Sequence, residues 1–372
     1  MHPGRILAFL LTVVLTLFIL SLVTISPGKD NHIHHQEEDI IADSSGTWAN
    51  DADSASSHPP SVPDSVSSAR PFRPDSVSAP SAFRPGPVSV PMAFRPGEAL
   101  RDSLADGGQV RIIYYGDSQL EGDRVTSLLR KTLRQEGGGT GPGLISPVMP
   151  VMYTRSYVVR SSSNWKRYTL LDYRNGTLSH NRLGPMLALC RFTPPGDSMR
   201  SRSFASVRIN PVPGADSAVS VYENLRIFYG NNHDTVLVSI RSASSLVDFA
   251  MLQMGEGPME YSVKLPGVSD VTVEFTGRNS PDIYAFSLES KTGVVVDNIP
   301  VRGSAGLEFV MTDSRGFEGC FSGLKPDIIF LQFGLNVVRN VRSEYHYYEE
   351  GLVKQINYLR QEIGRASCRE RV

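Results

Sequence analysis

The sequence predicts an α/β fold of the doubly wound type that is interrupted by an all-β sandwich. Three observations lead to this prediction. An apolar strand at residues 110–115 runs into a tight turn and a helix, short alternating segments fill residues 157–312, and a second buried strand with a helix follows them. Strands that alternate with helices indicate a parallel sheet, whereas many short strands separated by turns indicate a sandwich.

The chain has 372 residues, which is enough for more than one domain. It begins with an apolar, uncharged run at residues 6–25, directly after Arg5. A helix of this length crosses a bilayer core of ~30 Å, so residues 1–26 are expected to form a transmembrane anchor. A cleaved signal peptide is the alternative, although no Ala-x-Ala site follows the run. Arg5 favours an extracytoplasmic, periplasmic position for the rest of the chain.

Residues 27–107 are rich in Ser and Pro and lack apolar periodicity, which predicts a disordered linker. A Phe-Arg-Pro triplet recurs in it at 72–74, 83–85 and 94–96. These copies are too short to build a core, so the linker is interpreted as a spacer. The histidines within it form a solvated polar run and no metal site, namely His32, His34 and His35.

Folded sequence begins at residue 108, and residues 108–156 form the first part of the α/β domain. Residues 110–115 are β-branched and aromatic, which predicts a buried strand. Gly116, Asp117 and Ser118 break this strand, and residues 124–133 then carry apolar side chains at helical spacing. The unit is therefore a strand, a tight turn and a helix.

Residues 157–312 form the predicted sandwich, and no helix is expected within them. Their alternating stretches are separated by turn signals and lie at 204–209, 225–229, 235–241, 259–265, 271–275, 283–288 and 294–297. The second α/β part follows at residues 313–362, with a buried strand at 328–333 and an amphipathic helix at 347–363. Residues 363–372 resemble a translated vector or adapter sequence, so we expect them to be an artefactual tail.

Ser118 lies where chemistry is expected in such a fold. A strand that ends in Gly-Asp-Ser and opens a helix places the serine at the carboxyl edge of the sheet, where doubly wound folds bind ligands. The start of the helix adds free N–H groups and a positive dipole end. Ser118 can therefore present its hydroxyl to a substrate while its own N–H faces a developing oxyanion.

Three short blocks together resemble the SGNH/GDSL hydrolases. Residues 115–121 resemble the first block of that family, the glycine cluster at 139–143 resembles the second, and residues 333–336 resemble the third. The layout is similar to the envelope subgroup with an inserted β-sandwich, which includes peptidoglycan and polysaccharide O-acetylesterases. The resemblance covers residues 107–362 and implies a flavodoxin-like α/β fold.

The resemblance also implies roles for individual residues. Ser118 would be the nucleophile and would donate its N–H, and Asn336 would donate a hydrogen bond from its side chain. Gly141 is the preferred second backbone donor, with Gly143 next. Asp117 would shape the turn. No metal or cofactor is implied, and the partners would be an acylated polysaccharide or peptidoglycan substrate and the membrane.

Two departures from the family pattern limit this expectation. Val337 follows Asn336 where the family often has Asp, and no Asp-x-x-His occurs after Asn336. His346 comes too early to serve as that base. Because a serine hydroxyl needs a base, we expect a C-terminally truncated, inactive form of an O-acetylesterase. A carbohydrate-binding protein with an inactive hydrolase domain and an O-acyltransferase remain alternatives.

The remaining composition adds few constraints. The formal net charge of −1 shows no basic excess, so no nucleic-acid partner is expected. Cys190 and Cys320 could form a disulfide or remain two lone buried thiols, and both interpretations stay open. Among the aromatic residues that could instead stack on a sugar, packing is favoured for each, namely Trp165, Tyr168 and Tyr173.

Overall fold

The computed structural model of this chain describes residues 104–151, 153–193, 201–338 and 345–369. The anchor predicted for residues 1–26 and nearly all of the linker predicted for 27–107 lie outside these ranges. Within them, no helix combines the length and the hydropathy needed to cross a bilayer.

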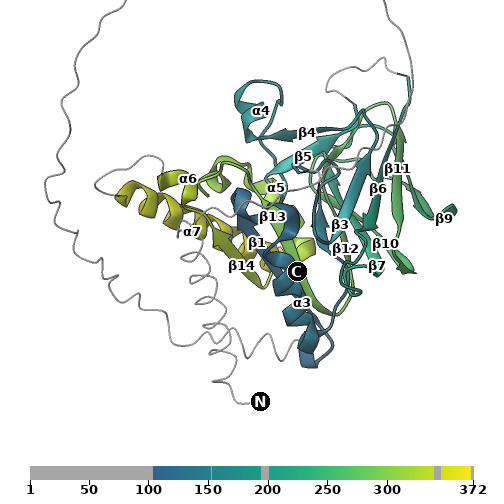
Figure 1. Cartoon of the computed structure of the whole chain (residues 1–372). Coiled ribbons are helices and arrows are strands. Elements are labelled where there is room, and N and C mark those ends of the chain that lie inside the picture. Colours follow the sequence, from purple (N-terminus) through teal and green to yellow (C-terminus); the bar gives the residue numbers. More distant parts are fainter. Residues whose placement is uncertain (1–103, 152, 194–200, 339–344, 370–372) are drawn as a thin grey trace, which may run out of the picture. The chain divides into compact units, whose positions relative to one another are not determined.

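A parallel sheet carries the α/β part of the molecule (Figure 1). Its central strand is β1 (Gln109–Gly116), which pairs with β13 (Gly293–Pro300) on one side and with β14 (Ile328–Gln332) on the other. Gly116 is in register with both Pro300 and Gln332. The carboxyl ends of these strands therefore meet at one edge of the sheet.

Helices cover both faces of this sheet, as expected for a doubly wound fold. On one face, Val110 and Ile112 of β1 pack in a cluster with leucines of α3 (Thr126–Gly137). On the other face, Ile113 and Tyr115 pack against η2 (Phe309–Met311), α5 (Ser314–Leu324) and α7 (His346–Arg369). The alternation along β1 thus assigns successive side chains to opposite layers.

The sandwich consists of two antiparallel sheets that share one apolar core. One sheet has the order β10 (Met259–Val268), β7 (Tyr222–Gly230), β12 (Asp282–Glu289), β5 (Ala188–Arg191) and β4 (Lys166–Thr169), with β2 (Gly143–Ile145) also paired to β12. The other has the order β3 (Tyr157–Ser161), β6 (Ser203–Pro211), β11 (Val271–Gly277), β8 (Leu237–Ser242) and β9 (Ser245–Met251). Trp165 packs edge-on against Phe192 and Phe275 in the core between them.

Two details of the predicted organisation are wrong. The segment at 294–297 was expected in the sandwich, but β13 pairs in parallel with β1, so the boundary at residue 312 falls too late. Every residue of β13 is buried, as is usual for parallel strands with both faces covered. A short helix, α4 (Leu170–Arg174), also interrupts the sandwich strands, and a capping box of Thr169 and Asp172 begins it.

The chain leaves the α/β part and returns to it at adjacent points. The N–H of Val294, at the start of β13, donates to the carbonyl of Gly138 at the end of α3, at 3.0 Å. A Cβ atom at Gly293 would lie 2.4 Å from the Gly139 nitrogen, so only glycine allows the two segments to approach this closely. The sandwich is therefore an insertion whose two ends touch.

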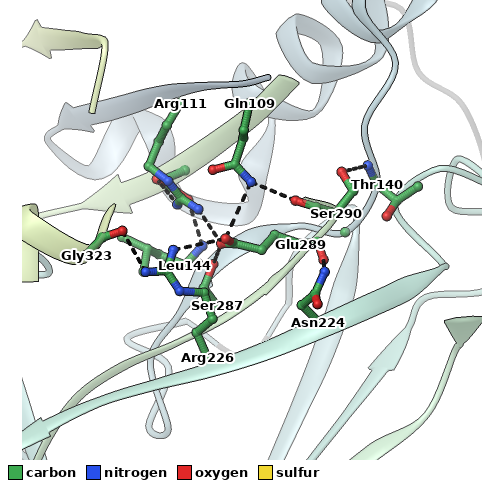
Figure 2. Close-up of polar contacts among 12 residues, drawn as sticks. Gln109, Arg111, Thr140, Leu144, Asn224, Arg226, Ser287, Glu289, Ser290 and Gly323 are labelled. Carbon is green, nitrogen blue, oxygen red and sulfur yellow. Dashed lines mark hydrogen bonds and ion pairs between the residues drawn. The ribbon is translucent and has the colours of Figure 1, made fainter. Parts of the chain in front are cut away.

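A buried ionic network joins the insertion to the parallel sheet (Figure 2). The guanidinium of Arg111 on β1 pairs with Asp297 of β13 at 2.8 Å and with Glu289 of β12. Arg226 of β7 reaches the same Glu289 carboxylate at 3.1 Å, and the Ser287 hydroxyl also donates to it. Arg111 and Asp297 are fully buried. A buried charge that loses its partner is costly, so this network ties the two parts together.

Cys190 and Cys320 are free thiols, and both are buried. The structure therefore excludes the disulfide and confirms the alternative of two lone thiols. Burial raises the pKa of each thiol above its ordinary value. Both side chains are accordingly expected to stay protonated and unreactive in the folded chain.

Candidate active site

Three loops meet where the parallel strands end. The first loop (residues 117–123) follows β1, the second loop (301–306) follows β13, and the third loop (333–338) follows β14. The N–H of Val301 donates to the Gly116 carbonyl at 2.7 Å, and that of Asp117 donates to the Gln332 carbonyl at 3.3 Å. These bonds hold the beginnings of the loops against the ends of neighbouring strands.

Ser118 lies at the start of the first loop, as the first residue of η1 (Ser118–Asp123). Asp117 precedes it as the N-cap, and its buried carboxylate accepts a hydrogen bond from the Gln119 N–H at 2.9 Å. The interpretation that Asp117 shapes the turn is thus confirmed. Ser118 is exposed, and no described residue accepts a hydrogen bond from its N–H or contacts its hydroxyl through one. Both groups are available to a ligand.

Asn336 lies in the third loop, within α6 (Leu335–Val338), and its side chain is half-buried. Its Nδ2 atom donates to the carbonyl of Ser304 in the second loop at 2.8 Å. An amide nitrogen carries two hydrogens, so one remains for a substrate oxygen. The structure therefore brings Asn336 to the same sheet edge as Ser118.

Gly141 does not lie at this edge, and its predicted role as a backbone donor is wrong. Its N–H already donates to the Ala218 carbonyl at 2.8 Å. A Cβ atom at Gly141 would lie 2.2 Å from the Leu288 carbonyl oxygen, which places this residue against β12. The glycine cluster is instead the crossing into the sandwich, where its small size and positive φ angles are needed.

Gly143, the second choice, is also in the wrong place. It is buried in β2, opposite Leu288, and a Cβ atom there would lie 2.3 Å from Oδ1 of Asp297. Asp297 is in register with Ile113, three residues before the end of β1. At ~3.3 Å per strand residue, this level is roughly 10 Å from the edge where Ser118 lies.

Among the glycines at this edge, Gly303 in the second loop was not predicted from the sequence. It is exposed, its φ is +75°, and no atom lies within 4 Å of the position that a Cβ would take. Within the described part of the chain, nothing accepts a hydrogen bond from its N–H. The available signal was a glycine three residues after a buried valine-rich strand, and it was obscured because that strand was assigned to the sandwich.

Several contacts fix the first and second loops in place. Arg302 forms a two-bond ion pair with Glu121, with distances of 2.6 and 2.7 Å. Asn298 of β13 donates to the Leu120 carbonyl at 3.2 Å, and the Leu120 side chain is fully buried. The Tyr348 hydroxyl donates to the Ala305 carbonyl at 3.0 Å. The edge is thus held before any ligand arrives, which favours electrostatic catalysis.

Tyr348 is held in its donor form by its surroundings. Burial raises its pKa above the ordinary value, and the negative charges of Glu308 and Asp117 raise it further. The hydroxyl therefore keeps its proton and continues to support the second loop at neutral and mildly alkaline pH.

The described histidines contact other side chains. His180 lies 3.0 Å from Asp282, His233 lies 2.8 Å from Asn231, and His346 lies 3.8 Å from Glu349. None of these partners belongs to the three loops. Within the described ranges, no group of His, Cys, Asp or Glu side chains could hold a metal ion.

Comparison with known proteins supports the fold. No protein-family model matches the chain, and no curated protein matches it. A solved structure of a peptidoglycan O-acetylesterase is similar, with a TM-score of 0.53 and 19% identity, over 72% of this chain and 68% of that chain. At this identity the similarity concerns the fold, and it extends over both the α/β part and the insertion.

Two carbohydrate-binding modules are weakly similar to this chain. A family 32 module from C. perfringens, solved with galactose, has a TM-score of 0.23 and 12% identity, over 36% of this chain and 93% of the module. A family 6 module has a TM-score of 0.22 and 10% identity, over 35% of this chain and 87% of the module. Neither similarity is strong enough to assign a role to the sandwich.

Proposed function

We propose that the protein is a serine esterase that removes acyl groups from a carbohydrate of the cell envelope, with O-acetylated peptidoglycan as its substrate. The observation that carries this proposal is the position of Ser118. Its exposed hydroxyl stands at the carboxyl edge of the sheet, beside two loops that supply Gly303 and Asn336. The similarity in fold to a peptidoglycan O-acetylesterase supports the choice of substrate.

In the proposed reaction, the Ser118 hydroxyl oxygen attacks the carbonyl carbon of the ester. The carbonyl oxygen gains negative charge and is held by the N–H of Ser118, the N–H of Gly303 and the second Nδ2 hydrogen of Asn336. Each such donor typically lowers the barrier by ~2.7–4 kcal/mol. The sugar leaves with its hydroxyl restored, and water then releases the acyl group from Ser118.

The attack also needs a base that takes the proton of the Ser118 hydroxyl. Because the described histidines have other neighbours, we propose that this base is a histidine outside the described residues. An Asp three residues before it would orient its ring. Both assignments rest on the family pattern that the first and third sequence blocks resemble.

The test is acetate release from O-acetylated peptidoglycan by the complete gene product. Ser118→Ala should reduce turnover to the background rate, because the attacking oxygen is lost. Ser127→Ala is a matched control, since its hydroxyl only reaches the Arg124 carbonyl within the same helical segment, at 3.4 Å. Turnover that survives in Ser118→Ala at the wild-type rate would exclude this serine as the nucleophile.

A further inference from the structure

Tyr153 is a conspicuous surface residue in the segment that connects β2 to β3. Its side chain is 75% exposed, the highest value among the large hydrophobic residues that the structure describes. An exposed aromatic ring is common on protein surfaces and needs no special role by itself. The position of this ring relative to Ser118 is what makes it informative.

The segment that carries Tyr153 is fastened to the loop that carries Ser118. The N–H of Arg155 donates to the Gly122 carbonyl at 3.0 Å. A Cβ atom at Gly122 would lie 3.5 Å from the Tyr153 carbonyl oxygen, so the two backbones are in contact. The backbone at Tyr153 therefore lies against the first loop, although Tyr153 belongs to the segment that leads into the sandwich.

A buried ion pair makes this attachment firm. The Ser156 hydroxyl donates to the Asp123 carboxylate, and Arg130 of α3 pairs with the same carboxylate at 2.9 Å. Neither charged side chain has any exposed surface. Since separating such a pair from its partners is costly, the backbone beside Tyr153 is held at a fixed place relative to the first loop.

The distance from Ser118 to this attachment suits a glycan. Gly122 is four residues after Ser118, and the backbone is kinked at Glu121 and Gly122. Because a chain spans at most ~3.6 Å per residue, the two residues lie within roughly 14 Å of each other. A glycan chain whose acylated sugar is bound at Ser118 can extend over such a distance. The apolar face of a pyranose ring packs well against an aromatic ring.

We propose that Tyr153 is a stacking platform for the sugar that neighbours the acylated sugar, and thereby makes the site selective for glycan chains. This inference rests on the proposed function, because it takes Ser118 as the reacting group. Of the other aromatic candidates, Trp165 and Tyr168 are buried, as predicted, whereas Tyr173 is 40% exposed on α4.

The experiment compares Tyr153→Ala and Tyr153→Phe in the complete gene product. Binding of chitotetraose is measured by calorimetry, and hydrolysis is measured on O-acetylated peptidoglycan and on p-nitrophenyl acetate. Tyr153→Ala should weaken chitotetraose binding and raise KM for peptidoglycan by about tenfold each, which corresponds to ~1.4 kcal/mol. KM for p-nitrophenyl acetate should not change, because that ester has no sugar ring beyond the acylated oxygen.

Matched variants separate stacking from general damage. Tyr153→Phe keeps the ring and should stay within about twofold of the wild type. Tyr173→Ala removes another exposed tyrosine, 40% exposed on α4, and should have no effect. If Tyr153→Ala keeps the wild-type affinity for chitotetraose, or if its KM rises equally on both esters, Tyr153 does not stack on the neighbouring sugar.

Failure of the proposed function gives a different result. If Ser118→Ala keeps hydrolysing peptidoglycan, the nucleophile is misassigned, and the calorimetry on Tyr153→Ala still decides whether the ring binds sugar. If Ser118→Ala is inactive while Tyr153→Ala behaves as the wild type, the esterase assignment stands and only the platform is lost.

Discussion

Asn336 and Ser304 are joined by a hydrogen bond of 2.8 Å, from Nδ2 of the asparagine to the carbonyl oxygen of the serine. The bond spans two loops that follow different strands, and it aligns the amide while one N–H stays free. Asn336→Ala should therefore lower kcat of the complete gene product by about 10²–10³, with little change in KM. Leu335→Ala, at the exposed neighbouring position, should keep the wild-type kcat. An unaltered kcat in Asn336→Ala would remove this residue from the oxyanion site.

The two candidate glycines should respond differently to an added methyl group. At Gly141 the Cβ would lie 2.2 Å from the Leu288 carbonyl oxygen and φ is +79°, so Gly141→Ala should lose about 3 kcal/mol of unfolding free energy. At Gly303 only the backbone conformation is strained, so Gly303→Ala should lose about 1 kcal/mol. Urea denaturation of both variants measures the difference, and equal losses would contradict the structure around Gly141.

Arg111 should be far more important for stability than an exposed arginine in a comparable pair. Arg111→Met leaves the Asp297 and Glu289 carboxylates in a buried site without their main counter-charge, and should cost about 3–5 kcal/mol. Arg302→Met breaks the pair with Glu121, but the Arg302 side chain is 65% exposed, so a much smaller loss is expected. Similar losses in the two variants would show that the Arg111 network contributes no more than a surface pair.

Glu289 should make folding sensitive to acid. Burial alone would raise its pKa, but the charges of Arg111 and Arg226 and the hydrogen bond from Ser287 outweigh it and bring the pKa to about 2. In the unfolded chain a Glu has a pKa of ~4.3. The folded state therefore favours the ionised form of Glu289. This preference stabilises the folded chain by roughly 3 kcal/mol above pH ~4.3. This contribution is lost as the pH falls towards ~2.

The matching experiment follows the unfolding free energy of the wild type and of Glu289→Gln between pH 6 and 3 (roughly, the range set by these pKa values). The wild type should lose stability on acidification, and the variant should show a flatter dependence. Asp297 acts with the opposite sign, because burial raises its pKa and the charge of Glu289 raises it further, so Glu289→Gln also removes part of this opposing effect. Glu274→Gln, at a partly exposed pair with Arg241, serves as the control. Parallel curves would contradict the depressed pKa.

Cys190 and Cys320 should not react while the protein is folded. Both are buried and their pKa values are raised, so little thiolate is available. In a Cys368→Ser background, a maleimide should label neither thiol in buffer and both in concentrated urea. Rapid labelling of the native protein would show that one of the two sites opens readily.

The elements around Ser118 could be predicted because local patterns determine them. The apolar run of β1, the break at Gly116 and the helical spacing in α3 lie within thirty residues of one another. The third block was also found, and the structure brings Asn336 to the same edge as Ser118. The catalytic roles of Asn336 and Ser118 remain predictions.

The position of Gly303, the proposed second donor, could not be predicted, because it depends on which strand returns to β1. Val294 of β13 pairs with Val110, a partner more than 180 residues away, and no local pattern records this pairing. The glycine cluster near Gly141 fits the family spacing, but the same small residues are needed where the chain crosses into the sandwich. The burial of β13 along its whole length shows that it belongs to the parallel sheet and not to the sandwich. The loop that follows β13 therefore lies at the edge that carries Ser118, and the glycine cluster does not.

The touching ends of the insertion have a consequence for engineering. Since Gly138 and Val294 already share a hydrogen bond, a very short peptide link could close the chain after excision of everything between them. Geometry would permit this shortcut, but the excised segment would take Glu289, Arg226 and the Leu144 N–H out of the buried network and leave only the Arg111–Asp297 pair. A minimal α/β domain would therefore have to cover this pair again, or replace both members together by neutral residues, for example as Arg111→Leu with Asp297→Asn.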